Sequence, residues 1–245
     1  MTAPAETSPL EARVGHYYRM DGTYLVGREK LREYARAVQD YHPAHWDVAA
    51  AAELGYSDVI APLTFTSAPG MQCNRRMFES IVVGYDTYLQ TEEVFEQHRP
   101  IVAGDELVID VELTSVRRTA GRDFITVTNT FTDTRGERVH TLHTTVVGVT
   151  AEDIDAGVKI AVQNAMMHDM NILDIGGDDA DYEKELRPPD GEIRISDGGL
   201  TRSPGTRSFD DLAVGEELPA HHTRVSRGDL VNYAGVAGDA TRFTG

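Results

Sequence analysis

Cysteine is almost absent from this chain of 245 residues, because Cys73 is the only one. An intrachain disulfide is therefore impossible, and nothing in the cysteine content indicates an oxidising compartment. Residues 1–7 lack the basic start and the apolar run of a secretory signal. No stretch reaches the ~20 apolar residues that a membrane-spanning helix needs. These absences predict a soluble cytoplasmic protein without a membrane partner.

Basic residues are scarce as well. The chain has 23 Lys and Arg against 40 Asp and Glu, which gives a formal net charge of −17. A phosphate-binding surface needs clustered basic side chains, so this balance argues against nucleic acid or anionic lipid as a partner. The pairs Arg75-Arg76 and Arg117-Arg118 are typical of a solvated surface, and would also suit one small anionic group.

Motifs for metal and nucleotide chemistry are missing too. The chain has no cysteine cluster, no His-Glu-x-x-His, no glycine-rich phosphate loop and no Gly-x-Ser-x-Gly. His42 and His45 are three residues apart, as are His140 and His143, but the second pair lies on a predicted strand, where such residues face opposite sides. We therefore predict no metal site, and we disfavour nucleotide-dependent enzymes and serine hydrolases.

The chain does contain an internal repeat. Val, Arg, Leu, Tyr, Ala and Asp recur in one order from Val26 to Asp40 and from Val225 to Asp239, at a constant offset of 199 residues (225 − 26). The first repeat continues into a whole domain, whereas little chain follows the second. We expect a domain over residues 1–150, a helix and an acidic, Pro- and Gly-containing linker over 151–205, and the truncated start of a second domain over 206–245.

Hydrophobic periodicity predicts the elements of the first domain. An amphipathic helix covers residues 28–39, Asp47 begins a short second helix that Gly55 follows, and a run over 71–83, after Pro69-Gly70, is the predicted core helix. Four segments rich in Val, Ile, Thr and Phe predict consecutive antiparallel strands, over residues 87–95, 105–116, 123–132 and 138–149. This order indicates an α+β domain in which one long helix is wrapped by a curved sheet.

Asp40 and His45 are the candidates for chemistry, because they lie on one loop between two predicted helices, with Pro43 between them. A histidine that titrates near neutral pH beside a carboxylate suits proton transfer. Taken alone, such a pair is more often a helix cap and a surface residue. The loop by itself therefore leaves both interpretations open.

Position within the repeat supports the catalytic interpretation. The loop resembles the Gly-Asp-x-Asn-Pro-x-His motif of the MaoC-like family of (R)-specific enoyl-thioester hydratases and (3R)-3-hydroxyacyl-thioester dehydratases. Asp40, Pro43 and His45 match this motif, while Gln39 replaces the Gly and His42 the Asn. The resemblance extends over most of residues 14–149, including the segments at 60–65 and 99–105.

This resemblance implies a hot-dog fold, with the second hot-dog repeat truncated, and a hydro-lyase of fatty-acid metabolism. It implies catalysis by Asp40 and His45 on an acyl-CoA or acyl-ACP thioester, without a cofactor. It also implies that the domain pairs as a homodimer, or as a heterodimer with a catalytic hot-dog subunit. The residues that it implies for substrate binding are Pro62, Leu63, Thr64 and Gly70.

One departure from the family keeps an alternative open. Catalytic members usually read Ile-Ala-His-Gly before the core helix, whereas this chain has Ile60-Ala61-Pro62-Leu63, and Pro62 has no amide hydrogen to donate. The Ala-Pro-x-Thr-Phe form is similar to the non-catalytic, acyl-binding half of two-part dehydratases. A third, weaker alternative is a hot-dog thioesterase with Glu79 as its carboxylate.

The second repeat matches the family motif better up to Asp239, which is its remnant of a catalytic site. Residues 208–218 resemble the opening strand of the catalytic unit, and Ala-Asn-Pro-Ile-His-Trp would be expected after Asp239. The observed tail, residues 240–245, is what that segment becomes when one nucleotide of the Asn codon is deleted. We therefore hypothesise a frameshift, and we expect 206–245 to be poorly ordered or loosely docked, since ~40 residues rarely bury a core alone.

Overall fold

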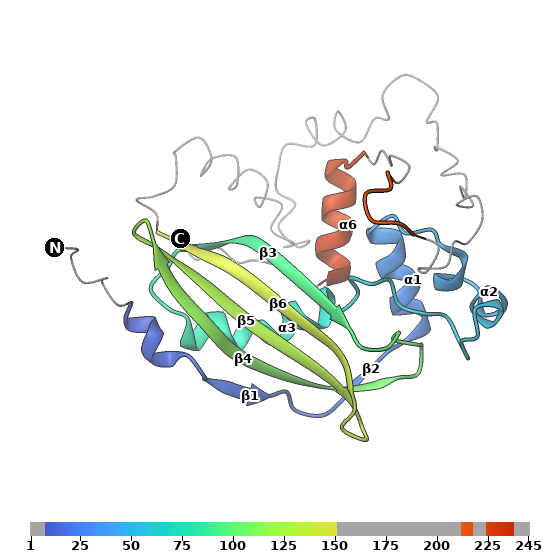
Figure 1. The fold of residues 1–245 in the computed structure, drawn as a ribbon, viewed down its shortest axis with the longest axis horizontal. Helices are drawn as coiled ribbons and strands as arrows, with labels where there is room; N and C mark the ends of the chain where they lie inside the picture. The colour runs from blue at the N-terminus through green and yellow to red at the C-terminus, as the bar shows by residue number, and fades with distance from the viewer. Residues whose placement is uncertain (1–7, 151–211, 218–223, 238–245) are drawn as a thin grey trace, which may run out of the picture. The chain divides into compact units, whose positions relative to one another are not determined.

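The computed structural model describes residues 8–150, 212–217 and 224–237. All of them belong to one compact unit, formed by residues 1–150 together with 207–245. A curved antiparallel sheet lies against one long helix, and further helices pack at one end of it (Figure 1). None of the helices in these residues is long and apolar enough to cross a membrane. The predicted α+β hot-dog architecture is confirmed.

The helical end of the domain is formed by three elements that flank the candidate loop. They are α1 (Arg28–Ala37), the 3-10 turn η2 (Pro43–His45) and α2 (Val48–Glu53). As predicted, α1 buries one stripe of side chains that includes Leu31 and Tyr34, and Asp47 caps α2 by accepting the N–H of Ala49. Both helices end within two residues of their predicted ends.

The core helix begins earlier than the sequence predicted. It comprises α3 (Ser67–Arg76) and a π-helical turn η3 (Met77–Ile81), whereas the prediction started at residue 71 and continued to 83. Pro69 lies in the first turn of α3, where a backbone N–H has no partner within the helix, so a proline is tolerated there. The helix therefore begins before Pro69-Gly70 and not after it.

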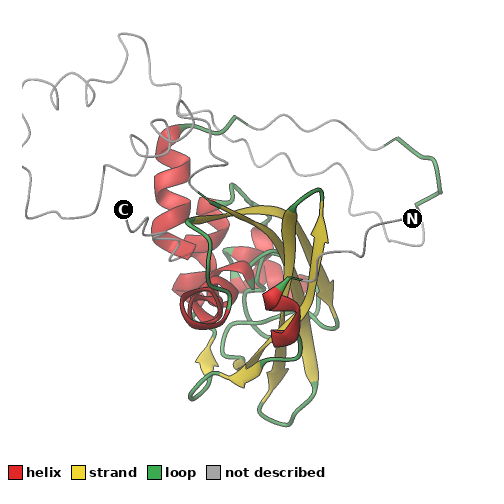
Figure 2. Cartoon of the chain, turned by 90° about the vertical axis from the view of Figure 1, so that its left-hand side faces the viewer, coloured by secondary structure: helices red, strands yellow, loops and turns green. Residues whose placement is uncertain are grey.

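Six strands form the sheet, in the order β1-β4-β5-β6-β3, with β2 also paired to β4. All the pairings are antiparallel, and Figure 2 shows the strands curving past the helices. The four predicted strands are confirmed to within three residues at each end. The short elements η1, β1 and β2 were not predicted. The elements of the sheet and its N-terminal edge are η1 (Pro9–Arg13), β1 (Tyr17–Arg19), β2 (Tyr24–Leu25), β3 (Thr87–Gln97), β4 (Glu106–Thr119), β5 (Arg122–Asp133) and β6 (Arg138–Val149).

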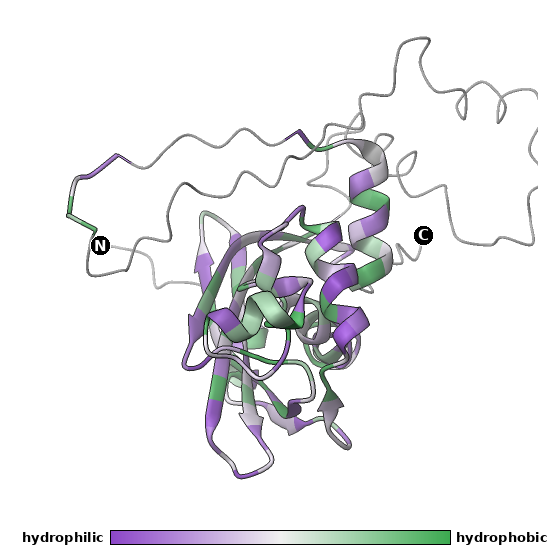
Figure 3. Cartoon of the chain, turned by 90° about the vertical axis from the view of Figure 1, so that its right-hand side faces the viewer, coloured by the Kyte–Doolittle hydropathy of each residue, from purple (hydrophilic) through white to green (hydrophobic). Residues whose placement is uncertain are grey.

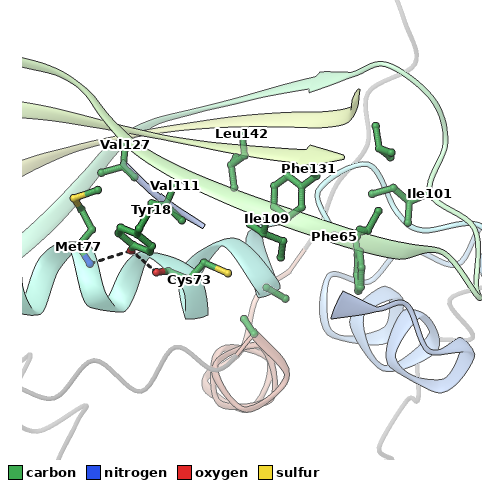
Figure 4. Packing of buried hydrophobic residues seen from close by; sticks show 14 of the residues in the cluster. Tyr18, Phe65, Cys73, Met77, Ile101, Ile109, Val111, Val127, Phe131 and Leu142 are labelled. Atoms are coloured by element: carbon green, nitrogen blue, oxygen red, sulfur yellow. Dashed lines mark hydrogen bonds between the residues drawn. The ribbon is translucent and has the colours of Figure 1, made fainter. Parts of the chain in front are cut away.

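The hydrophobic core lies between α3 and the face of the sheet that alternate residues of β4, β5 and β6 present (Figure 4). Two asparagines are buried in it, and each side chain donates to the other: Asn74 Nδ2 lies 3.1 Å from Asn129 Oδ1, and Asn129 Nδ2 lies 2.7 Å from Asn74 Oδ1. Buried polar groups are tolerated when they are paired in this way. The pair therefore fixes how closely α3 approaches the sheet and which residues of α3 lie opposite β5.

The hydroxyl of Tyr18 explains why the core helix changes form at Met77. It donates to the carbonyl oxygen of Cys73 at 2.6 Å and accepts the N–H of Met77 at 3.1 Å (Figure 4). Cys73 and Met77 are the partners that an α-helical i to i−4 bond would join directly. A side chain inserted into that ladder disrupts the helix locally, and the π-helical turn begins at this residue.

One helix of the second repeat is described, α6 (Arg227–Ala237). It packs against α1 and α3, and Lys30 Nζ donates to the carbonyl oxygen of Val236 at 2.5 Å. This differs from the expectation of a poorly ordered or loosely docked segment. The part of the expected opening strand that is described, residues 212–217, contains no strand. The linker over 151–205, Asp239 and the tail over 240–245 lie outside the described residues.

The Tyr18 insertion leads to a test of stability. Tyr18→Phe should lower the free energy of unfolding by about 1–2 kcal/mol, because two backbone groups of the core helix lose a buried partner. Tyr17→Phe, on the same strand, is the matched control: it removes a hydroxyl bonded to Asp110 from a residue that is 52% exposed, and should cost less. Urea denaturation measures both. Equal losses would contradict a special role for Tyr18.

Candidate active site

The loop between α1 and α2 brings Asp40 and His45 together. His45 Nε2 lies 3.2 Å from Asp40 Oδ2, and the His45 side chain is almost fully buried whereas Asp40 is 39% exposed. The carboxylate therefore faces solvent on one side and the imidazole on the other. Of the site residues predicted from sequence, these two form a direct pair.

Local sequence holds the loop in place. The main-chain N–H of His42 donates to Asp40 Oδ1 at 3.1 Å, and the ring Nδ1 of His42 accepts the N–H of Ala44 at 3.3 Å. His42 thus caps η2, the task that an Asn side chain performs well in such a turn. Trp46 Nε1 donates to the carbonyl oxygen of Asp40 at 3.1 Å. Each of these bonds joins residues within the loop, so the sequence of the loop largely specifies its shape.

A residue outside the loop fixes the orientation of His45. Its Nδ1 lies 2.8 Å from the carbonyl oxygen of Ile60. Because a carbonyl oxygen only accepts, Nδ1 carries a hydrogen, and Nε2 is the atom that exchanges protons with its surroundings. Ile60 is held in turn by an antiparallel bridge to Val102. The segment before the core helix therefore selects the tautomer of His45.

The electrostatics of the pair favour a charge-assisted hydrogen bond. The bond to His45 lowers the pKa of Asp40 below its ordinary value. Burial by itself lowers the pKa of His45, but the bonds to Asp40 and to the Ile60 carbonyl outweigh burial, and the net pKa is raised. The contribution of Asp40 to stability is lost as the pH falls through its lowered pKa, and that of His45 is lost as the pH rises through its raised pKa. The pair therefore stabilises the fold most between roughly pH 4 and 6.5.

Gln39, just before the loop, adopts a left-handed backbone with φ of 57°. This is the position at which the family motif has Gly, the residue that adopts positive φ without steric cost. The main chain must turn here, because the N–H of Asp40 bonds to the carbonyl oxygen of Ala35 at 2.8 Å. The departure from the motif thus keeps the geometry of the loop at the cost of local strain.

The four residues expected to bind substrate have different surroundings. Pro62 is buried, Leu63 is 56% exposed, and Thr64 accepts the Tyr34 hydroxyl through its carbonyl oxygen at 2.6 Å. Gly70 faces the sheet, where a Cβ atom on it would lie 2.9 Å from Leu142 Cδ2. The close approach of α3 to the sheet therefore explains why position 70 is a glycine. Residues 62–64 form the turn that leads into α3.

A second group of polar side chains lies at the start of α3, and the sequence did not indicate it. Thr66 Oγ1 lies 3.0 Å from His140 Nδ1, and Ser67 Oγ lies 3.3 Å from Glu93 Oε2. Burial lowers the pKa of His140 to about 4 and raises the pKa of Glu93. Only the tertiary fold brings α3, β3 and β6 together here.

The histidine pair of β6 is arranged as the strand period predicted. His140 faces the core, whereas His143 bonds to Thr128 on the opposite face of the sheet.

The remaining candidates lie on the surface. Glu79 is exposed and pairs with Arg75 at 3.9 Å, and Arg118 pairs with Asp123 at 3.4 Å. Within the ranges that the structure describes, no group of three His, Cys, Asp or Glu side chains is arranged to hold a metal ion. The Asp40–His45 pair is therefore the candidate active site that geometry supports best.

A helix wrapped by a curved antiparallel sheet defines a hot-dog fold. Residues 12–142 match the family model described as "FAS1-like, dehydratase domain region". The chain belongs to this family.

Among curated proteins, the chain is 37% identical over 164 residues to a UPF0336 protein of Mycolicibacterium paratuberculosis. The aligned residues cover 66% of this chain and 92% of that protein. A UPF0336 protein of Saccharopolyspora erythraea is 41% identical over 143 residues, 57% of this chain and 92% of that protein.

Two solved structures are similar. One, a "MaoC-like dehydratase", is 73% identical with a TM-score of 0.73, over 94% of this chain and 68% of that chain. The other is the HadBC (3R-Hydroxyacyl-ACP Dehydratase) complex from Mycobacterium tuberculosis, 36% identical with a TM-score of 0.52, over 56% of this chain and 97% of that chain. The predicted MaoC-like relationship is confirmed.

The strained position of Gln39 gives one prediction. Gln39→Gly should be more stable than Gln39→Ala by about 1 kcal/mol, because a glycine adopts the left-handed conformation without the Cβ clash that alanine retains. Both variants lose the same side-chain contacts, so the comparison isolates the backbone. Thermal or urea unfolding measures the difference, and a more stable alanine variant would contradict the strain.

The coupling within the pair gives another prediction. Asp40→Asn should lower the pKa of His45 relative to the unaltered chain, because burial remains while the interaction with the carboxylate is lost. Titration of the histidine signals by NMR measures this. Asp47→Asn, two residues after His45, keeps a capping side chain at α2 and should leave the titration of His45 unchanged. An unaltered pKa in Asp40→Asn would show that the pair is not coupled.

Proposed function

We propose that residues 1–150 form a (3R)-3-hydroxyacyl-thioester dehydratase, which also acts in reverse as an (R)-specific enoyl-thioester hydratase. The observation that carries this proposal is the Asp40–His45 pair, with 3.2 Å between Oδ2 and Nε2 and with His45 oriented by the Ile60 carbonyl. Membership of a dehydratase family supports it. Acid–base groups held at this separation suit the addition and removal of water.

The two side chains have separate tasks in the proposed reaction. In dehydration, Nε2 of His45 takes the proton from the α-carbon, whose acidity comes from the neighbouring thioester. Asp40 accepts the hydrogen bond of the β-hydroxyl and relays to that oxygen the proton that His45 has taken, so that the carbon–oxygen bond breaks with loss of water and both side chains return to their starting protonation states. A carbon–carbon double bond forms, and one water molecule leaves. Hydration follows the same steps backwards, with Asp40 holding the attacking water.

Stabilisation of the thioester oxygen is assigned to the backbone at the start of α3. Negative charge develops on that oxygen as the α-proton leaves, and preorganised N–H groups stabilise such a charge. Pro62 cannot contribute, so the amides of Leu63 and Thr64 are the proposed donors. The thioester itself delocalises the charge, and the proposed reaction therefore needs no cofactor.

The proposed substrate is an acyl thioester carried by coenzyme A or by an acyl carrier protein. The HadBC complex, which resembles this domain, is described as acting on a carrier-protein thioester and contains two kinds of subunit. We propose in the same way that the domain here works in a pair, as a homodimer or beside a second hot-dog subunit. The net charge of −17 slightly disfavours an acidic carrier protein.

A second candidate function is acyl binding without catalysis, as the accessory half of a two-part dehydratase. The observation that favours it is the turn before α3, where Pro62 is buried and Leu63 projects into solvent at 56% exposure. A side chain at that position occupies space that a glycine would leave open to a substrate. The thioesterase alternative is weaker, since Glu79 is 67% exposed and pairs with Arg75 on the surface.

Activity assays on the 245-residue chain separate these functions. Under the first proposal, Asp40→Asn and His45→Ala should each reduce hydration of a crotonyl thioester by about 100-fold or more, because each removes a proton-transfer group. Asp47→Asn is the matched control and should retain activity. Circular dichroism of each variant checks that the fold persists.

The same sample distinguishes the alternatives when hydration, release of free thiol and acyl-thioester binding are measured together. Binding without turnover would favour the accessory function, and thiol release would favour the thioesterase. Hydration that persists in both Asp40→Asn and His45→Ala would exclude the proposed roles.

A further inference from the structure

The turn from Pro62 to Thr66 is attached to the rest of the domain on two sides. From α1, the Tyr34 hydroxyl donates to the Thr64 carbonyl oxygen at 2.6 Å and lies 3.1 Å from Thr64 Oγ1. From β6, His140 Nδ1 lies 3.0 Å from Thr66 Oγ1. Figure 3 looks onto the helical end of the domain and shows α1 in front of the sheet. The turn therefore bridges these two layers, and one side chain of each layer holds it.

The main-chain bonds within the turn use its later N–H groups. The N–H of Phe65 donates to the Pro62 carbonyl oxygen at 2.9 Å, and the N–H of Ser67 donates to the Thr64 carbonyl oxygen at 3.0 Å. Among the residues that the structure describes, the N–H groups of Leu63 and Thr64 donate to no acceptor. These two groups are the donors already proposed for the thioester oxygen, and the shape of the turn sets their direction.

The Thr66–His140 pair is expensive for the fold. Both residues are 1% exposed, and burial lowers the pKa of His140 to about 4, so the imidazole is neutral near pH 7. Its ring lies against Phe95 and Phe131, and Nε2 has no hydrogen-bond partner in the described part of the chain. A buried polar atom without a partner costs about 1–3 kcal/mol, and two apolar side chains of the same shape would avoid this cost. Stability therefore does not explain the pair.

We propose that Tyr34 and the Thr66–His140 pair are positioning residues, which aim the amides of Leu63 and Thr64 at the oxygen of a bound acyl thioester. The inference rests on the proposed function, because it uses the same turn and the same substrate. Preorganised donors stabilise a developing charge without reorganising as it forms, and this requires a turn that is held rigidly. The role is the same in a dehydratase and in an accessory acyl-binding domain, since both bind the thioester.

Infrared difference spectroscopy of a bound thioester tests the positioning role. The probe is butyryl-CoA, labelled with heavy carbon at the thioester carbonyl and bound to the 245-residue chain. Hydrogen bonds to the carbonyl oxygen lower its stretching frequency, so the bound band should lie below that of the thioester in solution. Thr66→Val and Tyr34→Phe should each lose most of this shift, whereas Thr66→Ser keeps the hydroxyl and should retain it.

The outer face of the sheet provides a matched control. Thr128 Oγ1 lies 2.9 Å from His143 Nδ1, so Thr128→Val removes a threonine hydroxyl from a similar pair on the same two strands. That pair has no contact with the turn, and the carbonyl shift should remain. Equal loss of the shift in Thr66→Val and Thr128→Val would overturn the proposal.

A double variant separates positioning from a purely structural role. Thr66→Val with His140→Leu replaces both polar partners by apolar side chains, so it should be at least as stable in urea as the unaltered chain and still lose the shift. A double variant that is as stable and keeps the shift would overturn the proposal.

Kinetics show whether the proposed dehydratase and the positioning role fail together or separately. In crotonyl-thioester hydration, Thr66→Val should lower kcat about tenfold or more and leave KM nearly unchanged, because its donors are misdirected and act most strongly in the transition state. An unaltered chain that shifts the carbonyl band but does not hydrate would contradict the dehydratase alone. A chain that binds butyryl-CoA without any shift would overturn the positioning role, and a chain that binds no thioester would overturn both.

Discussion

The depth at which α3 lies in the curved sheet governs the rest of the structure. Helix and sheet approach most closely at Gly70, where even a methyl group would lie only 2.9 Å from the Leu142 side chain. That approach allows Asn74 and Asn129 to exchange two hydrogen bonds, and Thr66 to reach His140. A helix held at this depth fixes the turn before it, and this turn is continuous with the segment whose carbonyl orients the candidate catalytic histidine.

The helix α1 contacts the core, the turn before α3 and the helix α6. Its buried stripe anchors it to the core, and the hydroxyl of Tyr34 ties it to the Thr64 carbonyl at the entrance to α3. The loop with Asp40 and His45 leaves its C-terminal end, so packing of α1 positions the candidate site. Its remaining face contacts α6. The same helix thus connects the candidate site, the core helix and the second repeat.

Much of the fold could be predicted because local sequence patterns indicate its main helices and strands. Alternating residues and turn glycines located the four long strands, and a 3.6-residue period located α1. The core helix starts before the predicted position, because Pro69-Gly70 indicates a break in the sequence although a proline fits the first turn of a helix. The π-helical turn was not predictable, since it depends on Tyr18, 55 residues before Cys73. Strands as short as β1 and β2 have too few residues to show a period.

Some features of the candidate site likewise depend on local sequence, and others depend on the tertiary structure. The sequence by itself determined the residue types and the spacing of Asp40 and His45, the cap supplied by His42, and the repeat that marks α6 as a second α1, because each depends on neighbours along the chain. Only the tertiary structure decided that the Ile60 carbonyl selects the histidine tautomer, that Gly70 packs against the sheet, and that Tyr34 meets Tyr233. Those contacts join segments that are distant in sequence, and the path of the folded backbone, which local propensity does not encode, brings them together.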